Sequence, residues 1–229
     1  MMMIKNYLLT TTSLVLACIL FSSVLSHSQV RTEEGSLDEK VARFLSRMKR
    51  EWRDLNVPEE DGRILYETII QNRYTKALEI GTSTGHSALW IAWALSKTGG
   101  KLITIEIDEE RHREAVAHFK EAGLTQYIDA RLADAHQLVK KLPGPFDFVF
   151  IDADKNWYVQ YAKDLVQKVE PGGCIAAHNV VKPPADRSGG YWRGTEEYYL
   201  YVKALPGFET RIHPQSPAGL CLSYKRARE

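Results

Sequence analysis

Two glycines spaced four positions apart, Gly81 and Gly85, mark the segment of this chain with the clearest chemistry. They follow a short apolar run that contains Glu79, and an apolar, helix-like segment comes directly after them. Glycine lets a backbone approach a ligand closely, and the N-terminus of a helix offers unpaired N–H groups. The next apolar run ends at Glu106, and an acid at that place in a strand–helix–strand unit accepts hydrogen bonds from ribose hydroxyls. The pattern predicts a site for a cofactor that carries a nucleoside.

Strands and helices must alternate along the chain to hold such a site. The apolar runs predict five strands, at 75–80, 101–106, 127–132, 146–152 and 173–177. The segments before and between them have helical periodicity, at 37–55, 58–72, 86–97, 109–122, 134–141 and 156–169. Helices of this length between strands indicate right-handed crossovers and therefore a parallel sheet.

The last part of the chain departs from this alternation. A predicted helix at 195–204 is followed by two strand-like runs, 209–213 and 219–224, which a short segment with two prolines connects. Strands joined by so short a connection pair in an antiparallel hairpin. The predicted fold class is therefore α/β and Rossmann-like, with a mostly parallel seven-stranded sheet, a C-terminal antiparallel hairpin and helices on both faces.

The first 28 residues have the features of an export signal. Lys5 precedes a long apolar stretch, and small or polar residues follow up to a cleavage point after Ser28. The apolar stretch is also long enough to remain as an uncleaved membrane anchor. We expect a signal peptide or anchor at 1–28, a flexible lead-in at 29–36 and a single domain at 37–229. The protein is then periplasmic or secreted, or membrane-anchored through this segment if the segment is retained.

The bulk composition bears on the class of partner and on the cysteines. With 30 basic and 29 acidic residues the formal net charge is +1, which gives no electrostatic reason to expect nucleic acid as a partner. Beyond residue 28 the chain has two cysteines, Cys174 and Cys221, near predicted strands. Such cysteines are usually small buried hydrophobes. In an oxidising compartment they could instead form a disulfide, if their strands are neighbours.

Five motifs occur in order along the chain. They are Glu51-Trp52-Arg53-Asp54-Leu55-Asn56-Val57, Leu78-Glu79-Ile80-Gly81 with Gly85-His86-Ser87-Ala88, Ile103-Thr104-Ile105-Glu106-Ile107-Asp108, Phe150-Ile151-Asp152-Ala153-Asp154-Lys155, and Ala177-His178-Asn179-Val180. Together they resemble the small cation-dependent O-methyltransferases that use S-adenosylmethionine, the group of catechol O-methyltransferase and caffeoyl-CoA O-methyltransferase. The resemblance covers about residues 37–225, and the first motif and the absence of long insertions favour the catechol branch. It implies the class I methyltransferase fold, a small phenolic or catechol substrate, and a monomer or homodimer.

The resemblance also implies which residues bind S-adenosylmethionine. Val57 and Ser87 would hold the methionine end of the cofactor, near Glu79 and Gly81. Glu106 would bind the ribose hydroxyls, and Asp134 would lie beside the adenine. The whole implied set of cofactor-binding residues is Val57, Glu79, Gly81, Gly85, Ser87, Glu106, Ile107, Asp134, Ala135 and Asp152.

The implied reaction is an in-line transfer of a methyl group from sulfur to a phenolic oxygen. A phenol is a poor nucleophile until it loses its proton, and a divalent cation that binds both hydroxyls of a catechol assists that loss. Asp152 follows a predicted buried strand, where an α/β fold places its site, and Lys155 lies three residues further on. We expect both residues to be catalytic, with Lys155 as the base, because a neighbouring cation and partial burial favour the neutral amine.

The implied metal ligands, Asp152, His178 and Asn179, include a departure from the family pattern. That pattern has Asp-Asn at the end of the fifth strand, where this chain has His178-Asn179. Magnesium prefers oxygen ligands and imidazole suits softer ions, so the expected metal is Mg²⁺ or one of Mn²⁺, Co²⁺, Fe²⁺ and Zn²⁺. Three outcomes are open. His178 ligates with a shifted metal preference, it turns away and leaves a weak magnesium site, or the chain has lost metal dependence.

Apolar and aromatic side chains beside the motifs are candidates for the substrate walls. The predicted substrate-binding residues are Trp52, Leu55, Lys155, Trp157, Tyr158 and Trp192. Trp192 lies in a predicted loop, 179–194, that could close over the substrate as a lid. Trp52 is also at helical spacing with apolar neighbours, which makes a core position an equal alternative.

Two alternatives to a catechol enzyme remain at this point. One is a caffeoyl-CoA-like or broader phenolic specificity. The other is a non-catalytic protein that binds S-adenosylmethionine or a phenol, which the export signal favours because the cofactor is made in the cytosol. Asp152 and Lys155 argue against a mere binder, since binding alone requires neither residue.

Overall fold

The computed structural model describes residues 35–52, 55–180 and 190–227, with the side chains of the last range described from residue 193 onward. One compact unit spans Leu37–Glu229. The predicted export segment at 1–28 and most of the lead-in at 29–36 lie outside the described residues.

Seven strands form one sheet, in the order β3-β2-β1-β4-β5-β7-β6. β1 to β5 pair in parallel, and β7 runs antiparallel to both β5 and β6. The strands are β1 (Lys76–Ile80), β2 (Lys101–Glu106), β3 (Ile128–Leu132), β4 (Phe146–Ile151), β5 (Val169–Ala177), β6 (Phe208–Ile212) and β7 (Cys221–Lys225). The predicted parallel sheet with an antiparallel C-terminal hairpin is confirmed.

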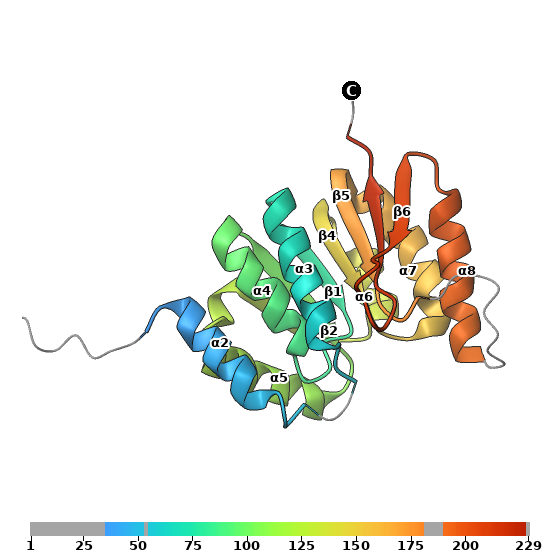
Figure 1. Ribbon diagram of the computed structural model, residues 1–229. Helices are drawn as coiled ribbons and strands as arrows, with labels where there is room; N and C mark the ends of the chain where they lie inside the picture. The colour runs from blue at the N-terminus through green and yellow to red at the C-terminus, as the bar shows by residue number, and fades with distance from the viewer. Residues whose placement is uncertain (1–34, 53–54, 181–189, 228–229) are drawn as a thin grey trace, which may run out of the picture. The chain divides into compact units, whose positions relative to one another are not determined.

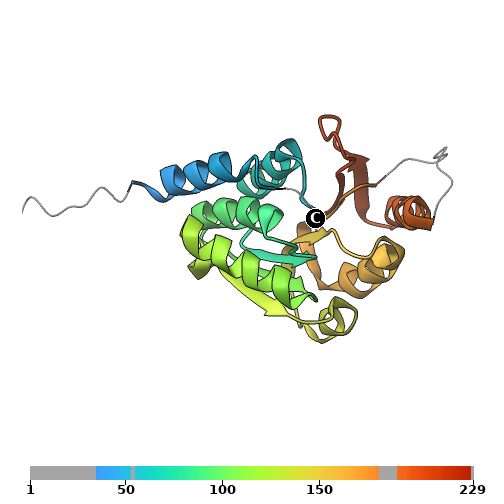
Figure 2. The ribbon, with the colours of Figure 1, turned by 90° about the horizontal axis from the view of Figure 1, so that it is seen from below.

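Helices cover both faces of this sheet (Figures 1 and 2). On one face lie α3 (Glu59–Asn72), α4 (His86–Thr98) and α5 (Glu109–Ala122), with α2 (Leu37–Met48) packed against α4 and α5. On the other face lie α6 (Ala135–Lys141), α7 (Tyr158–Leu165) and α8 (Gly190–Ala204). Two separate hydrophobic cores therefore flank the sheet.

Strand β4 is buried from both sides, because its successive side chains enter opposite cores. Phe148 and Phe150 belong to the core under α3 and α4, whereas Val149 and Ile151 belong to the core under α7 and α8. Side chains alternate between the faces of a strand, so a strand covered on both faces needs a continuous apolar run. This burial fixes the position of Asp152, the residue that follows the strand.

The sheet reverses its strand order between β1 and β4. In open α/β sheets the ligand crevice lies outside the carboxyl ends of the strands at such a switch point. Gly81 follows β1, Asp152 follows β4, and the Asp152 N–H donates to the Ile80 carbonyl at 2.9 Å. Gly81 has φ +95°, and a Cβ atom there would come within 2.7 Å of the Ala153 Cβ. The glycine is required both by its backbone angle and by the close approach of the two strand ends.

Some element boundaries differ from those expected from the sequence. The helix expected over 37–55 ends at Met48, whose carbonyl accepts from both Glu51 N and Trp52 N in a turn. The apolar spacing continues to Trp52 because its ring still packs inward, on His86 and His118. Helix α8 begins at Gly190, within the segment that was expected to be a loop.

Cys174 and Cys221 lie in neighbouring strands but are not paired with each other. In the β5–β7 register Cys174 is opposite Tyr224, and Cys221 is opposite Ala177. The two thiols belong to different cores, on opposite faces of the sheet, and both are free. The disulfide alternative is therefore wrong, and both cysteines act as small buried hydrophobes.

Candidate active site

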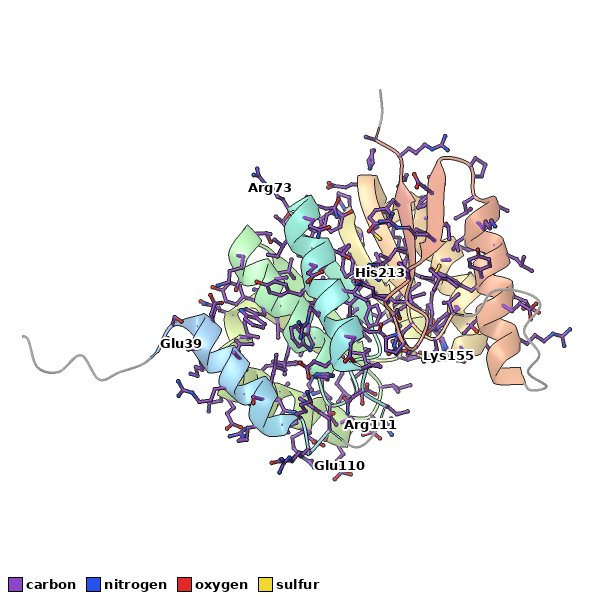
Figure 3. All side chains as sticks on the ribbon, viewed as in Figure 1. Glu39, Arg73, Glu110, Arg111, Lys155 and His213 are labelled. Atoms are coloured by element: carbon purple, nitrogen blue, oxygen red, sulfur yellow. The ribbon has the colours of Figure 1, made fainter. Side chains whose placement is uncertain are left out.

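A cleft of about 700 Å³ lies outside the carboxyl ends of β1, β2, β4 and β5. Its volume is in the usual range for a small-molecule site. Figure 3 shows Lys155 at the same end of the domain as Arg111, while Arg73, which precedes β1, lies at the opposite end. The cleft brings together predicted residues from all five motifs, namely Leu55, Gly81, Glu106, Ile107, Asp152, Lys155, His178 and Asn179.

The turn after β1 has the features of a cofactor cradle. Gly81 lines the cleft, and the fully buried Glu79 lies two residues before it, with its Oε2 accepting from the Thr104 hydroxyl. Glu79 Oε1 is buried without a hydrogen-bond partner among the described residues. Burial raises the pKa of Glu79 to about 8. A buried, half-satisfied carboxylate fits the ammonium group of an amino acid, the chemistry of the methionine end of S-adenosylmethionine.

Glu106 is held in place by three backbone donors. Its Oε2 accepts from Ser83 N at 2.7 Å, and its Oε1 accepts from the N–H groups of Ile107 and Asp108 at 3.0 Å. These bonds fix the carboxylate at the edge of the cleft. A carboxylate oxygen can accept more than one hydrogen bond, so Glu106 can also accept from the hydroxyls of a ribose.

Other residues predicted to contact the cofactor lie outside the lining of this cleft. Asp134 caps α6 by accepting from His136 N at 2.8 Å, and Ala135 is the first residue of that helix. Val57 and Ser87 are buried, and Val57 lines a second cavity with Trp52. Gly85 has φ +98° and precedes α4, where a Cβ atom would come within 2.6 Å of the Phe119 ring.

Asp152, Lys155 and Tyr158 form a hydrogen-bonded group at the floor of the cleft. Lys155 Nζ donates to Asp152 Oδ1 and to the Tyr158 hydroxyl, both at 2.6 Å. The Tyr158 hydroxyl in turn donates to the His178 carbonyl at 3.1 Å. The side chains of Lys155 and Asp152 are only 9% and 12% exposed. The two predicted catalytic residues, Asp152 and Lys155, are thus in contact. The buried Tyr158 orients Lys155 through the hydrogen bond that its hydroxyl accepts.

His178 lies between two carboxylates. Its Nε2 is 2.9 Å from Asp61 Oδ2, and its Nδ1 is 3.3 Å from Asp152 Oδ2. Burial lowers the pKa of His178, but the hydrogen bonds and charges of Asp152 and Asp61 outweigh this effect and raise the pKa to about 9. Burial likewise opposes ionisation of Asp152, yet His178 and Lys155 hold its pKa below the ordinary value. At neutral pH His178 therefore carries a proton beside the ionised Asp152.

Asp61 is a site residue that the sequence reasoning missed. It lies in the first turn of α3, where acidic residues are ordinary because they complement the helix dipole. The side chain is nonetheless 0% exposed. The available signal was its spacing, because Asp61 shares a helix face with the buried Ile64, Leu65 and Thr68. A carboxylate on the core-facing side of a helix requires a partner, and here the partner is His178. Arg111 and Ser83, which also line the cleft, were missed as well.

The contacts of the implied metal ligands do not fit a divalent cation. A ligating imidazole needs a bare nitrogen, whereas both ring nitrogens of His178 face carboxylates. Each carboxylate oxygen of Asp152 faces a nitrogen atom of the protein, Lys155 Nζ or His178 Nδ1. Within the described ranges no group of three or more His, Cys, Asp and Glu side chains has the arrangement of a metal site. The alternative in which His178 turns away is wrong, because both of its ring nitrogens contact carboxylates of the site.

The predicted substrate-wall residues differ in where their side chains lie. Leu55 is 64% exposed and lines the cleft. Trp52 packs on His86, with 4.9 Å between ring centroids, and lines the second cavity. Trp157 packs on His136 with 4.0 Å between ring centroids and the rings tilted by 31°, and Tyr158 is fully buried. Trp192 belongs to α8, but its side chain lies outside the described residues. Of the predicted wall residues whose side chains the structure describes, Leu55 and Lys155 line the cleft, and the three others pack on protein.

Helix α8 packs against the backbone of Lys155 at Gly194. A Cβ atom on Gly194 would overlap the carbonyl oxygen of Lys155. We expect Gly194→Ala to displace Lys155, to cost about 1–3 kcal/mol of stability through overpacking, and to lower kcat with little change in cofactor affinity. Turnover, cofactor titration and thermal denaturation would measure these effects, with the exposed Leu200→Ala in the same helix as control. Wild-type turnover in Gly194→Ala would show that α8 does not position Lys155.

Comparisons with known proteins agree with this architecture. A family model described as O-methyltransferase matches residues 29–183. A catechol O-methyltransferase of Niastella koreensis is 41% identical over 109 residues, which span 46% of this chain and only 49% of that enzyme. Caffeoyl-CoA O-methyltransferase 1 of Eucalyptus globulus is 30% identical over 175 residues, 72% of this chain and 71% of the relative. A solved O-methyltransferase from Bacillus cereus, in complex with SAH, has 24% identity and a TM-score of 0.68, with 87% of this chain and 94% of that chain covered.

The fold and the cleft define a Rossmann-like methyltransferase. The family model matches more than half of the chain, and the Eucalyptus relative matches more than two thirds of it. The chain belongs to the S-adenosylmethionine-dependent O-methyltransferase family, in the group that includes the catechol and caffeoyl-CoA enzymes.

Proposed function

We propose that this enzyme transfers a methyl group from S-adenosylmethionine to one hydroxyl of a small ortho-dihydroxyphenyl compound. The observation that carries the proposal is the Asp152–Lys155 pair, whose atoms are 2.6 Å apart in the same cleft as Gly81 and Glu106. A proton acceptor for the substrate therefore lies beside the residues that fit the methyl donor. The cofactor, when bound, supplies an activated methyl group on sulfur.

The side chains of the cleft have separate tasks in this proposal. Glu79 binds the ammonium of the methionine end, and Glu106 accepts from the ribose hydroxyls. Lys155 takes the proton of the hydroxyl that is to be methylated, so that the oxygen can attack the methyl carbon in line while the bond from that carbon to sulfur breaks. Asp152 orients Lys155 and accepts from the neighbouring hydroxyl. Leu55, exposed at the cleft, packs against the ring of the substrate.

No step of this proposal passes through a metal ion, because the contacts of His178 and Asp152 do not fit one. Asn179 lines the cleft beside them and offers its amide to the second hydroxyl of the substrate.

A second candidate substrate is a caffeoyl thioester or another broader phenolic. The observation in its favour is the coverage of the relatives, since the Eucalyptus caffeoyl-CoA enzyme matches 72% of the chain and the Niastella catechol enzyme 46%. The two candidates share the dihydroxyphenyl group and differ in the bulk attached to it.

A direct assay distinguishes the candidates. The purified full chain is incubated with S-adenosylmethionine and, in parallel, a 3,4-dihydroxyphenyl acid, caffeoyl-CoA and the matching 4-hydroxyphenyl acid, and products are identified by mass spectrometry. We expect a singly methylated dihydroxyphenyl acid and no product from the monohydroxyl control. Product from caffeoyl-CoA alone would favour the thioester, and cofactor binding without any product would favour the non-catalytic alternative.

Location is a separate proposal that is supported by the sequence of residues 1–28. We infer that the protein is exported, or membrane-anchored if this segment is retained, and that it is a monomer or homodimer. In the part of the chain that the structure describes, no helix combines the length and apolarity of a membrane span. Sequencing the mature N-terminus distinguishes cleavage from retention.

A further inference from the structure

Four ionisable side chains, three of them buried and the fourth 12% exposed, form a row across the floor of the cleft. They are Asp61, His178, Asp152 and Lys155, and the successive contacts are 2.9, 3.3 and 2.6 Å. The row begins at Asp61, whose side chain is 0% exposed, and ends at Lys155, which lines the cleft. Along the row two carboxylates alternate with two nitrogen-bearing side chains, so each Asp152 oxygen already has a partner from the protein.

The position of His178 in this row decides the sign of its charge. An ionised carboxylate can only accept hydrogen bonds. An imidazole ring with a carboxylate beside each nitrogen therefore donates to both carboxylates only when both of its nitrogens carry a proton. Such a ring has no lone pair for a metal. The ring delivers positive charge to Asp152, another of the implied metal ligands, from the protein side of the cleft.

We infer that the Asp61–His178–Asp152 bridge takes the place of the divalent cation in this enzyme, and that the site neither binds nor needs such an ion. Asp61 is the positioning residue of the bridge, because it holds His178 against Asp152 without lining the cleft itself. The catalytic part of this inference rests on the proposed function. The binding part does not, because ion binding is measurable without turnover.

Manganese binding tests the inference directly. The full chain is titrated with Mn²⁺ alone and free Mn²⁺ is followed by electron paramagnetic resonance. We expect wild type to show no one-to-one binding below about 1 mM. His178→Asp places a third carboxylate beside Asp61 and Asp152, and we expect it to bind Mn²⁺ at least about tenfold more tightly. His112→Asp, the same substitution in the first turn of α5, is the matched control and should bind no more than wild type.

Turnover supplies the second measurement. Methyl transfer by wild type should survive thorough chelation and gain nothing from added Mg²⁺ or Mn²⁺. Asp61→Asn should lower kcat with cofactor affinity unchanged, which separates positioning of the reacting groups from a general loss of structure.

The outcomes of these experiments distinguish failure of this inference from failure of the proposed function. One-to-one Mn²⁺ binding by wild type, or activity that chelation abolishes and metal restores, would overturn the inference. Failure of a folded His178→Asp to gain Mn²⁺ affinity would also overturn it, since His178 would then not occupy the place of an ion. If that variant does not fold, the wild-type titration decides. Absence of turnover with every phenol would contradict the proposed function and leave the titration to decide the inference.

Discussion

Replacing Lys155 with methionine is expected to lower kcat by about 10²–10⁴-fold, the usual contribution of a positioned general base. Methionine keeps the apolar length of the side chain but cannot accept a proton. Affinity for S-adenosylmethionine should be nearly unchanged, because Lys155 lies on the substrate side of the cleft, beside Asp152 and Tyr158. Single-turnover methyl transfer and cofactor titration measure the two quantities separately.

The control for this experiment is Lys163→Met, which changes a lysine of α7 whose ammonium lies over the Tyr201 ring. It should keep wild-type turnover. The fold of Lys155→Met should also persist, since Asp152 retains His178 as a partner. A Lys155→Met protein with kcat within tenfold of wild type would show that another group takes the substrate proton.

The second large effect is expected at Glu79. Glu79→Gln should weaken the binding of S-adenosylmethionine by about 10- to 150-fold, the range for one hydrogen bond to a charged group. The glutamine keeps the shape and the contact with the Thr104 hydroxyl. It loses the negative charge that fits the ammonium of the cofactor. Isothermal titration calorimetry measures the affinity, with the exposed Glu67→Gln of α3 as control.

Glu79 should also make both the stability of the fold and the affinity for the cofactor depend on pH. Burial raises the pKa of Glu79 from 4.5 to about 8 in the cofactor-free protein. Between these two values the folded chain holds a proton that the unfolded chain releases, so the contribution of this group to stability falls as pH rises through the window. Thermal denaturation between pH 5 and 8 should therefore show a smaller loss of stability for Glu79→Gln than for wild type.

Binding of the cofactor should reverse the protonation of Glu79, because a bound ammonium favours the carboxylate. We expect proton release on binding at pH 7, measured by calorimetry in buffers that differ in ionisation enthalpy, and none for Glu79→Gln. Equal proton release by both proteins would assign the linkage to a different group.

The sequence by itself determined the sheet, the family and most of the cleft. Apolar runs such as 146–151 and the helical periodicity between them are local properties, and local pattern is enough to predict alternating strands and helices. Because parallel strands end at one edge of a sheet, residues directly after them, such as Gly81, Glu106 and Asp152, had to converge. Their order along the chain carried the resemblance to the O-methyltransferases.

The tertiary structure alone decided the chemistry of the charged row. Asp61 and His178 are 117 residues apart, and nothing local to either residue specifies the other. The same holds for Tyr158, whose aromatic type indicated a substrate wall but whose hydroxyl is hydrogen-bonded with Lys155 in the core. Burial and charge pairing depend on which elements pack together. The role of a histidine between two carboxylates therefore follows only once α3 is placed beside the ends of β4 and β5.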